Sequence, residues 1–263
     1  RSNEPVSLGL AHVAPYNCGL TRSFVDDMVK DKLAFLDGVV VHRMCLQSQG
    51  LPFILEQNAK LPYLEYLSMP PLYKGAPYHD FLVQEMERFK KGLEAYSGRE
   101  ITFEDINRSI EVYNKNRQLL HEIYEIRRRK PGAIKASEIA GIVQSSMPMP
   151  KEENNMLLED VIEELQQRNM SENVNKKLPI VTYGCLCQRP QFELLDLIED
   201  LGMVVVDDDV FVGSRYFANQ VEISDNPIEA LAARYMKRTP PCPTKGDIET
   251  DWTDYIIEMV QEN

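Results

Sequence analysis

The feature that most constrains the fold of this chain is a helical apolar repeat between residues 102 and 129. Thr102 and Asp105 have the spacing of a capping box, in which each side chain caps a backbone N–H group of the other residue. Apolar residues then recur on one helical face, and basic residues at 127–130 stand before Pro131, where they complement the helix dipole. The pattern predicts one long helix from Thr102 to about Arg129.

Amphipathic patterns predict two more helices beside it, at about 79–97 and 151–168, and another at 252–261. A further helix starts near Ser23, directly after a polar stretch that contains Cys18. The charged residues of the central helical region lie on the side opposite the apolar ones. We therefore expect the basic and acidic runs to form solvated faces.

Short β-branched runs predict strands on both sides of the helical region. The run at 37–43 has the composition of a buried parallel strand after a turn, and a second strand is expected at 61–67. In the second half, strands at 178–184 and 203–207 flank a helix at 190–201. A β-loop-α-β unit belongs to a parallel sheet, so we expect an α/β fold with ligands outside the carboxyl ends of its strands.

A chain of 263 residues is long enough for about two domains. We expect a first α/β domain at 1–75, a helical segment at 76–175 and a second, incomplete α/β domain at 176–263. No strand follows the expected C-terminal helix, which leaves the second sheet unfinished. We therefore expect this polypeptide to be a fragment of a longer one, truncated at one or both ends.

The net charge is −12, with 41 acidic and 29 basic residues, and it opposes binding to nucleic-acid phosphates. No apolar run reaches the roughly 20 residues that span a bilayer. Five cysteines are an odd number, which disfavours a secreted disulfide framework. We expect a cytoplasmic protein with no nucleic-acid or membrane partner, whose cysteines are reduced thiols, metal ligands or buried small residues.

Cys18 and Cys45 are the first candidate metal ligands. Both are expected in loops at the carboxyl edge of the first sheet, and thiolates from separate loops suit a soft metal centre or an iron–sulfur cluster. Their spacing matches no compact ferredoxin or zinc-finger pattern, and buried cysteines without a ligand are common, so both interpretations stay open. A single histidine such as His42, at the end of the strand, is more often a core residue than a proton donor.

Three other cysteines and an aspartate run are weaker candidates. Cys185 and Cys187 lie on opposite sides of an extended segment, so one of them is a candidate ligand, and a small-residue pocket lining is the alternative. Cys242 lies in a proline-rich loop and is expected to be structural or incidental. The aspartates at 207–209 project in different directions and cannot enclose a cation by themselves, so we expect solvated or helix-capping acids.

Four segments together resemble the benzoyl-CoA reductase and 2-hydroxyacyl-CoA dehydratase family, and the likeness extends along nearly the whole chain. Their order and spacing carry the resemblance more than any one segment does. The aspartate run and the residues after it, together with DNPIEALA at 225–232, are more similar to the benzoyl-CoA reductase branch. The four segments are LDGVVVHRMC at 36–45, RSIEVYNKNRQLL at 108–120, ELLDLIED at 193–200 and VDDDVFVGSRYF at 206–217.

The resemblance implies a cluster-bearing subunit with two Rossmann-like domains and a helical insertion, paired with a homologous second cluster-bearing subunit. It implies that Cys18 and Cys45 are two of the three cysteines that hold a [4Fe-4S] cluster. The third family cysteine follows the helix that 252–261 matches, so we expect this ligand beyond residue 263. The family segment before the first cysteine is also shortened here. The isolated chain is therefore expected to hold little stable cluster.

Three thiolates leave one iron without a protein side chain, so that this iron can bind water, hydroxide or substrate. The resemblance thus implies low-potential single-electron reduction of an acyl-CoA thioester, with electrons from a separate ATP-hydrolysing iron–sulfur activator. The chain has no P-loop, GxGxxG, HExxH or GxSxG motif, which agrees with ATP hydrolysis in another protein. Benzoyl-CoA reductase is the favoured activity. The alternatives are a 2-hydroxyacyl-CoA dehydratase component and a non-catalytic electron-transfer or scaffold subunit.

Overall fold

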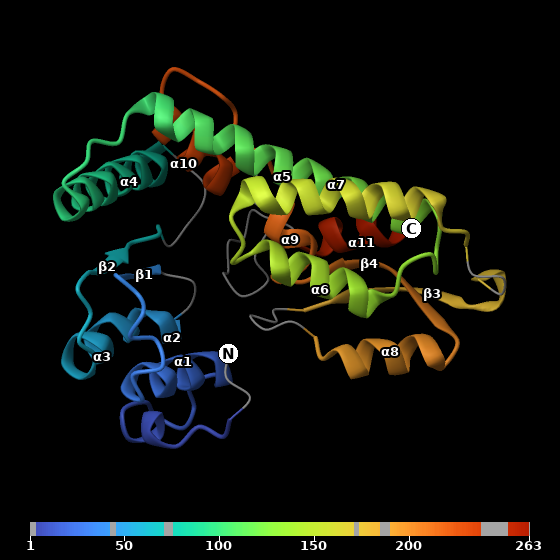
Figure 1. Ribbon diagram of the computed structural model, residues 1–263, viewed down its shortest axis with the longest axis horizontal. Helices are drawn as coiled ribbons and strands as arrows, with labels where there is room; N and C mark the ends of the chain where they lie inside the picture. The colour runs from blue at the N-terminus through green and yellow to red at the C-terminus, as the bar shows by residue number, and fades with distance from the viewer. Residues whose placement is uncertain are drawn as a thin grey trace. The chain divides into compact units, whose positions relative to one another are not determined.

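The chain divides into two compact units, Arg1–Ile101 and Thr102–Asn263. The computed structural model describes residues 4–42, 46–70, 76–170, 174–184, 190–237 and 252–262. Figure 1 shows the elements of an α/β protein, with short parallel sheets and many helices. The division between the units falls inside the segment that the sequence predicts to be helical. The predicted domain boundaries near 75 and 175 stay a prediction.

The first unit is built on a two-stranded parallel sheet, as predicted, in which Val39 of β1 lies opposite Leu64 of β2. β2 begins after Pro62, later than expected, because proline cannot donate to the sheet ladder. In β1 only Val41 is buried, so the expectation of a fully buried strand is wrong. The elements are η1 (Leu8–Ala11), α1 (Gly19–Val29), β1 (Val39–His42), α2 (Leu46–Gln49), α3 (Leu51–Asn58), β2 (Leu64–Leu67) and α4 (Ala76–Ser97).

Helix α4 is fixed to β2 by Arg88. Its guanidinium donates to Glu65 Oε1 at 2.9 Å, to Glu85 Oε1 at 2.8 Å and to the Tyr66 carbonyl at 2.7 Å. These carboxylates raise the pKa of Arg88, which keeps it charged. The helix predicted at 79–97 therefore exists and belongs to the first unit.

The second unit combines a helical layer with another two-stranded parallel sheet. The long predicted helix is confirmed as α5, and α5 packs along α7 (Figure 1). Between them lies a core that includes Leu120, Ile123 and Leu158. The predicted strands and the other predicted helices are also present, whereas α6, α9 and α10 were not predicted. The elements are α5 (Phe103–Arg129), α6 (Ala136–Ser146), α7 (Lys151–Gln167), η2 (Val174–Lys176), β3 (Leu178–Tyr183), α8 (Phe192–Asp200), β4 (Met203–Asp209), α9 (Ser214–Phe217), α10 (Pro227–Lys237) and α11 (Trp252–Glu262).

The capping box at the start of α5 gives a first prediction. Thr102 Oγ1 accepts a hydrogen bond from the Asp105 backbone N–H at 3.1 Å, and Asp105 Oδ2 accepts one from the Thr102 backbone N–H at 3.1 Å. Thr102→Ala is expected to lower the free energy of unfolding by about 1 kcal/mol, because an N–H group of the first turn loses its partner. Urea unfolding followed by circular dichroism measures the change. Thr102→Ser keeps the hydroxyl, and an equal loss in that variant would contradict the capping role.

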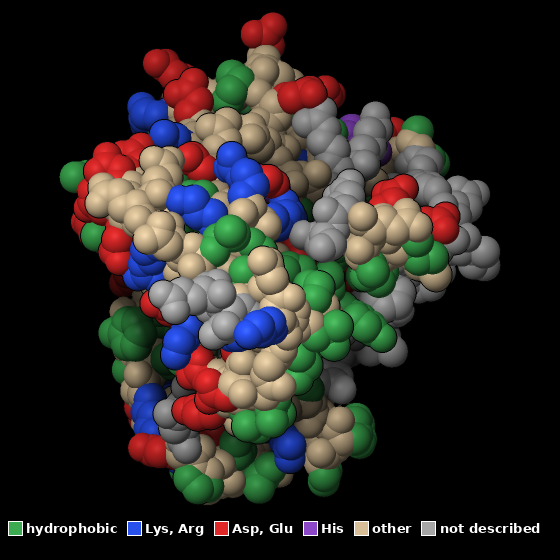
Figure 2. Space-filling model, turned by 90° about the vertical axis from the view of Figure 1, so that its right-hand side faces the viewer, with side chains coloured by type: hydrophobic (Ala, Val, Ile, Leu, Met, Phe, Trp, Pro, Cys, Tyr) green, Lys and Arg blue, Asp and Glu red, His purple; other side chains and the backbone are tan. Residues whose placement is uncertain are grey.

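In the part of the chain that the structure describes, no helix is long and apolar enough to cross a bilayer. On the face shown in Figure 2, Asp and Glu side chains lie next to Lys and Arg side chains.

Candidate functional site

Cys18 lies at the N-cap of α1, in the first unit. Its Sγ accepts a hydrogen bond from the Thr21 backbone N–H at 3.5 Å and lies 3.4 Å from Thr21 Oγ1. Burial alone would raise the pKa of the thiol, but the hydrogen bonds from Thr21 and the backbone N–H of Leu20 outweigh it, so the pKa of Cys18 is lowered. The thiolate is the form that binds metals, and a helix N-terminus stabilises it.

This environment fits a cluster ligand, because Cys18 is half-buried and its thiolate is favoured. The second predicted ligand, Cys45, lies outside the described residues, three positions beyond the last residue of β1. That both thiols lie on the same side of the first unit therefore stays a prediction. His42 is exposed at the end of β1, so its interpretation as a core residue is wrong.

The three remaining cysteines, at 185, 187 and 242, also lie outside the described residues. Within the described ranges, no group of three or more His, Cys, Asp or Glu side chains is arranged to hold a metal ion. The roles predicted for these cysteines stay predictions.

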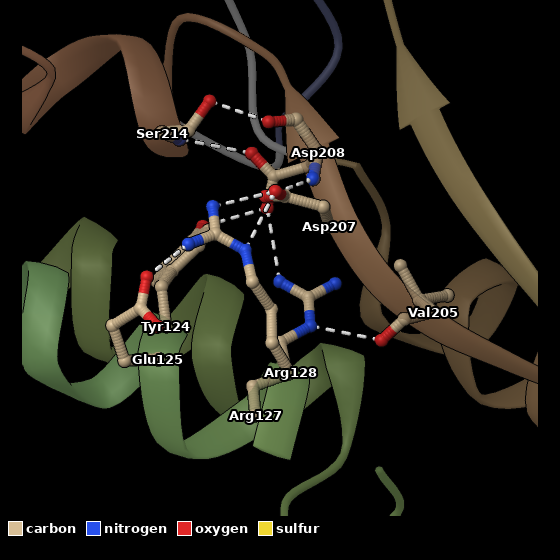
Figure 3. Close-up of polar contacts among 8 residues, drawn as sticks. All are labelled: Tyr124, Glu125, Arg127, Arg128, Val205, Asp207, Asp208 and Ser214. Carbon is tan, nitrogen blue, oxygen red and sulfur yellow. Dashed lines mark hydrogen bonds and ion pairs between the residues drawn. The ribbon is translucent and has the colours of Figure 1, made fainter. Parts of the chain in front are cut away.

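The carboxyl end of β4, in the second unit, carries the three aspartates at 207–209. They are 1%, 7% and 1% exposed, so the expectation of solvated acids is wrong, whereas the alternative of a helix-capping acid is met by Asp208, which accepts a hydrogen bond from the backbone N–H of Ser214, the first residue of α9. Each carboxylate is paired with an arginine instead. Figure 3 shows two of these arginines reaching from α5 toward Asp207 and Asp208.

Asp208 lies at the centre of this network. Its Oδ2 accepts a hydrogen bond from the Tyr124 hydroxyl at 2.6 Å and forms an ion pair with Arg127 Nη1 at 3.2 Å. Arg127 also donates from Nε to the Val205 carbonyl at 2.8 Å and is only 2% exposed (Figure 3). Burial, and then the charge of Asp208, raise the pKa of Tyr124 well above its ordinary value. The sequence prediction that places Arg127 on a solvated basic run is therefore wrong.

Asp207 and Asp209 are paired in the same way. Arg128 donates to Asp207 Oδ2 from Nη2 at 2.6 Å and from Nε at 3.0 Å. Arg215 contacts Asp209 from Nε at 2.6 Å and from Nη2 at 2.9 Å, with both side chains buried. The Arg215 guanidinium also lies 5.8 Å from the ring centroid of Tyr255 in α11, and burial together with Asp209 raises the pKa of Tyr255 to about 12.

Gly213 and Ser214, which follow β4, both depend on the position of the Asp208 carboxylate. The Ser214 backbone N–H donates to Asp208 Oδ1 at 2.9 Å, and its hydroxyl donates to the Asp208 carbonyl. A Cβ atom on Gly213 would lie 2.2 Å from Asp208 Oδ1, so only glycine fits there without displacing the carboxylate. On the neighbouring strand end, the Gly184 backbone N–H donates to the Asp209 carbonyl at 3.2 Å. The network thus holds both strand ends in place, and its carboxylates are engaged by cations rather than available for proton transfer.

The partners of the aspartates were missed from the sequence, although a signal for one of them exists. Arg127 follows Leu120 and Tyr124 at helical spacing, so it lies on the apolar face of α5 rather than on the solvated face. A cation in the buried stripe of a helix requires an anionic partner. The aspartate run provides this partner.

Comparison with known proteins shows to which family the chain belongs. The family model described as 2-hydroxyglutaryl-CoA dehydratase, D-component, matches residues 1–263. The chain belongs to this family. The resemblance predicted from the four segments is therefore confirmed.

Members of the D-component family that resemble this chain include subunits of both reductases and dehydratases. A benzoyl-CoA reductase subunit of Thauera aromatica is 26% identical over 97% of this chain and 66% of its own length. The (R)-phenyllactyl-CoA dehydratase beta subunit of Clostridium sporogenes is 23% identical over 99% of this chain and 68% of its own length. The (R)-2-hydroxyglutaryl-CoA dehydratase beta subunit of Acidaminococcus fermentans is 26% identical over 86% of this chain and 59% of its own length. The chain thus spans about two thirds or less of the length of these relatives.

Proposed function

We propose that this chain is the cluster-bearing part of a subunit that acts on acyl-CoA thioesters by low-potential single-electron reduction. The observation that carries the proposal is the family match over the whole chain, with a benzoyl-CoA reductase subunit among the relatives. Reduction of the aromatic ring of benzoyl-CoA is the favoured reaction, because the reductase subunit combines 26% identity with 97% coverage of this chain, whereas the phenyllactyl-CoA dehydratase subunit is 23% identical and the 2-hydroxyglutaryl-CoA dehydratase subunit covers 86%. The parallel pairs β1–β2 and β3–β4 support two Rossmann-like domains with a helical insertion.

The proposed cofactor is a [4Fe-4S] cluster held by Cys18, Cys45 and a third thiolate from beyond residue 263. The lowered pKa of Cys18 supports its part in this set. When bound, such a cluster supplies single electrons and one iron that lacks a protein side chain. The buried network behind the strand ends of the second unit keeps that edge rigid, because each of its aspartates is paired with an arginine.

The proposed partners follow from the same family. Each of the relatives reported above is named as a subunit of an enzyme, which supports a homologous second cluster-bearing subunit for this chain. The chain has no P-loop motif, so we assign ATP hydrolysis to a separate iron–sulfur activator. The proposed location of the assembly is the cytoplasm.

A 2-hydroxyacyl-CoA dehydratase component is the second candidate. The family description and two of the relatives reported above favour it, because they name dehydratases. In that reaction the hydroxyl group leaves through a ketyl radical, whereas benzoyl-CoA reductase reduces an aromatic ring. A non-catalytic electron-transfer or scaffold subunit is the remaining alternative.

The test is anaerobic co-expression with the partner subunit, followed by assay with the reduced activator and ATP. Benzoyl-CoA and an (R)-2-hydroxyacyl-CoA are offered separately, and products are identified by mass. We expect a ring-reduced product that carries two more hydrogens than benzoyl-CoA. Loss of water from the hydroxyacyl-CoA alone would assign the dehydratase instead. A cluster-loaded complex without either product would indicate the electron-transfer role, and a complex without iron would overturn the proposal.

A further inference from the structure

The side chain of Thr21, in the first turn of α1, lies against the proposed cluster ligand Cys18. Its hydroxyl oxygen is 3.4 Å from Cys18 Sγ, and its backbone N–H donates to the same sulfur at 3.5 Å. A threonine inside a helix can instead direct its hydroxyl to a backbone carbonyl one turn earlier. Across the residues that the structure describes, Thr21 Oγ1 has no hydrogen-bond partner other than this sulfur. The hydroxyl is therefore directed at the thiol group.

The chain segment that leads to Cys18 is fastened to the helix that follows it. Asp26 Oδ1 accepts hydrogen bonds from the backbone N–H groups of Ser7 at 3.0 Å and Gly9 at 2.8 Å. A Cβ atom on Gly9 would lie 2.7 Å from the Asp26 backbone nitrogen, so a larger residue there would displace the segment from α1. The position of the thiol at the start of α1 is therefore set by contacts within the protein itself.

The direction of this hydrogen bond follows from the chemistry of a metal-bound thiolate. A thiolate bound to iron carries no proton, so its sulfur can only accept and the Thr21 hydroxyl must donate. Hydrogen bonds to the sulfurs help to set the potential of an iron–sulfur cluster, because they strengthen as reduction adds negative charge. Thr21 is 8% exposed, so water has little access to replace the hydroxyl as donor. Such a bond therefore stabilises the reduced form of a cluster.

We propose that Thr21 is a positioning residue, which orients the Cys18 thiolate through its hydroxyl and raises the reduction potential of the cluster that this thiolate holds. The inference rests on the proposed function, because it requires a cluster on Cys18. It extends that function by giving a named side chain a part in setting how readily the cluster accepts an electron. The backbone N–H of Thr21 also contacts the sulfur, but substitution removes only the hydroxyl.

The test is a reductive titration of the anaerobically purified complex, followed by electron paramagnetic resonance. Titanium(III) citrate is the reductant, and each cluster that it reduces takes up one electron. Valine has the shape of threonine without the hydroxyl. We expect Thr21→Val to lower the equilibrium constant for reduction of one cluster about fivefold, which corresponds to about 40 mV for a one-electron couple. The cluster of the homologous partner subunit is the internal reference, and its potential is expected to stay unchanged.

Two further variants make the result specific to this hydroxyl. Thr21→Ser retains the hydroxyl and is expected to have the potential of the parent complex. Thr182→Val makes the same atomic change in β3, in the other unit, and is expected to leave the potentials of both clusters unchanged. A parent potential in Thr21→Val with full iron content would overturn the proposal, as would an equal shift in Thr182→Val.

A merely structural role for Thr21 gives a different result. Loss of the hydroxyl would then lower the Tm and the iron content of Thr21→Val, while the clusters that remain keep the parent potential, and this outcome would refute the proposal. Failure of the proposed function is recognised separately, because the parent complex itself would then contain no iron and both proposals would be wrong. A cluster-loaded complex whose potential does not respond to residue 21 would leave the proposed function standing.

Discussion

Asp208→Asn is expected to lower the free energy of unfolding by about 3–5 kcal/mol, because it leaves a buried arginine without its counter-ion. Arg127 is 2% exposed, and Asp208 is the carboxylate with which it forms an ion pair. Asparagine keeps the size of the side chain but removes the charge, so the loss measures electrostatics rather than packing. Urea unfolding of the whole chain, followed by circular dichroism, gives the value.

Two further variants make this prediction specific. Asp200→Asn removes the same charge from an exposed position at the end of α8, and its effect is expected to stay within about 0.5 kcal/mol. In the double variant Asp208→Asn with Arg127→Met, no buried charge is left unpaired at this position, so the combined loss should be well below the sum of the two single losses. Additive losses would mean that the two side chains do not act as a pair.

Cys18→Ser is expected to reduce the iron of the anaerobically purified complex to below about a tenth of the parent content and to abolish turnover. Loss of one of three proposed thiolates exposes the cluster to solvent, and a serine hydroxyl is a poor ligand for iron compared with a thiolate. Iron and sulfide assays after desalting measure the content, and the visible absorbance of the cluster gives an independent reading.

The matched control for this substitution is Cys242→Ser, which makes the same atomic change at a cysteine that the sequence predicts to be structural or incidental. Its iron content is expected to match that of the parent complex. Full iron content in Cys18→Ser would remove Cys18 from the ligand set. Equal depletion in both variants would show that the iron depends on general integrity and not on the thiolate at the start of α1.

The parts of the fold that depend on local sequence are predictable. The sequence predicts helix α5 to within one residue at each end, because its capping box, apolar stripe and basic end all lie within the helix itself. Helix α6 was not predicted, although Ile139, Ala140 and Val143 recur at helical spacing and are buried; it is short and lies between two proline-containing stretches. The strands are predicted in both halves, although burial is overestimated for β1, whose side chains outside Val41 remain partly or fully exposed.

The candidate site is less predictable, because its charged partners are distant in sequence. The prediction of solvated aspartates at 207–209 is wrong, because it considered only residues near them in sequence, and of their three arginine partners only Arg215 lies nearby. Two of their partners lie on α5, since Arg127 precedes Asp208 by 81 positions and Arg128 precedes Asp207 by 79. The environment of Cys18 is predicted only in part: the sequence places this residue before a helix, but the helix begins at Gly19 rather than near Ser23, so that Cys18 is its N-cap and accepts backbone hydrogen bonds from the first turn.

The bond between Arg127 and the Val205 carbonyl joins residues that are 78 positions apart, and the hydrogen bond from Tyr124 to Asp208 joins residues 84 positions apart. A ribosome therefore completes α5 well before it makes the strand that receives these side chains. During that interval the nascent helix exposes Arg127 and Tyr124 on its apolar stripe without their hydrogen-bond acceptors. Such an exposed surface is prone to bind chaperones or to associate incorrectly. The buried network of the second unit consequently cannot form before β4 emerges and Asp208 arrives to neutralise Arg127.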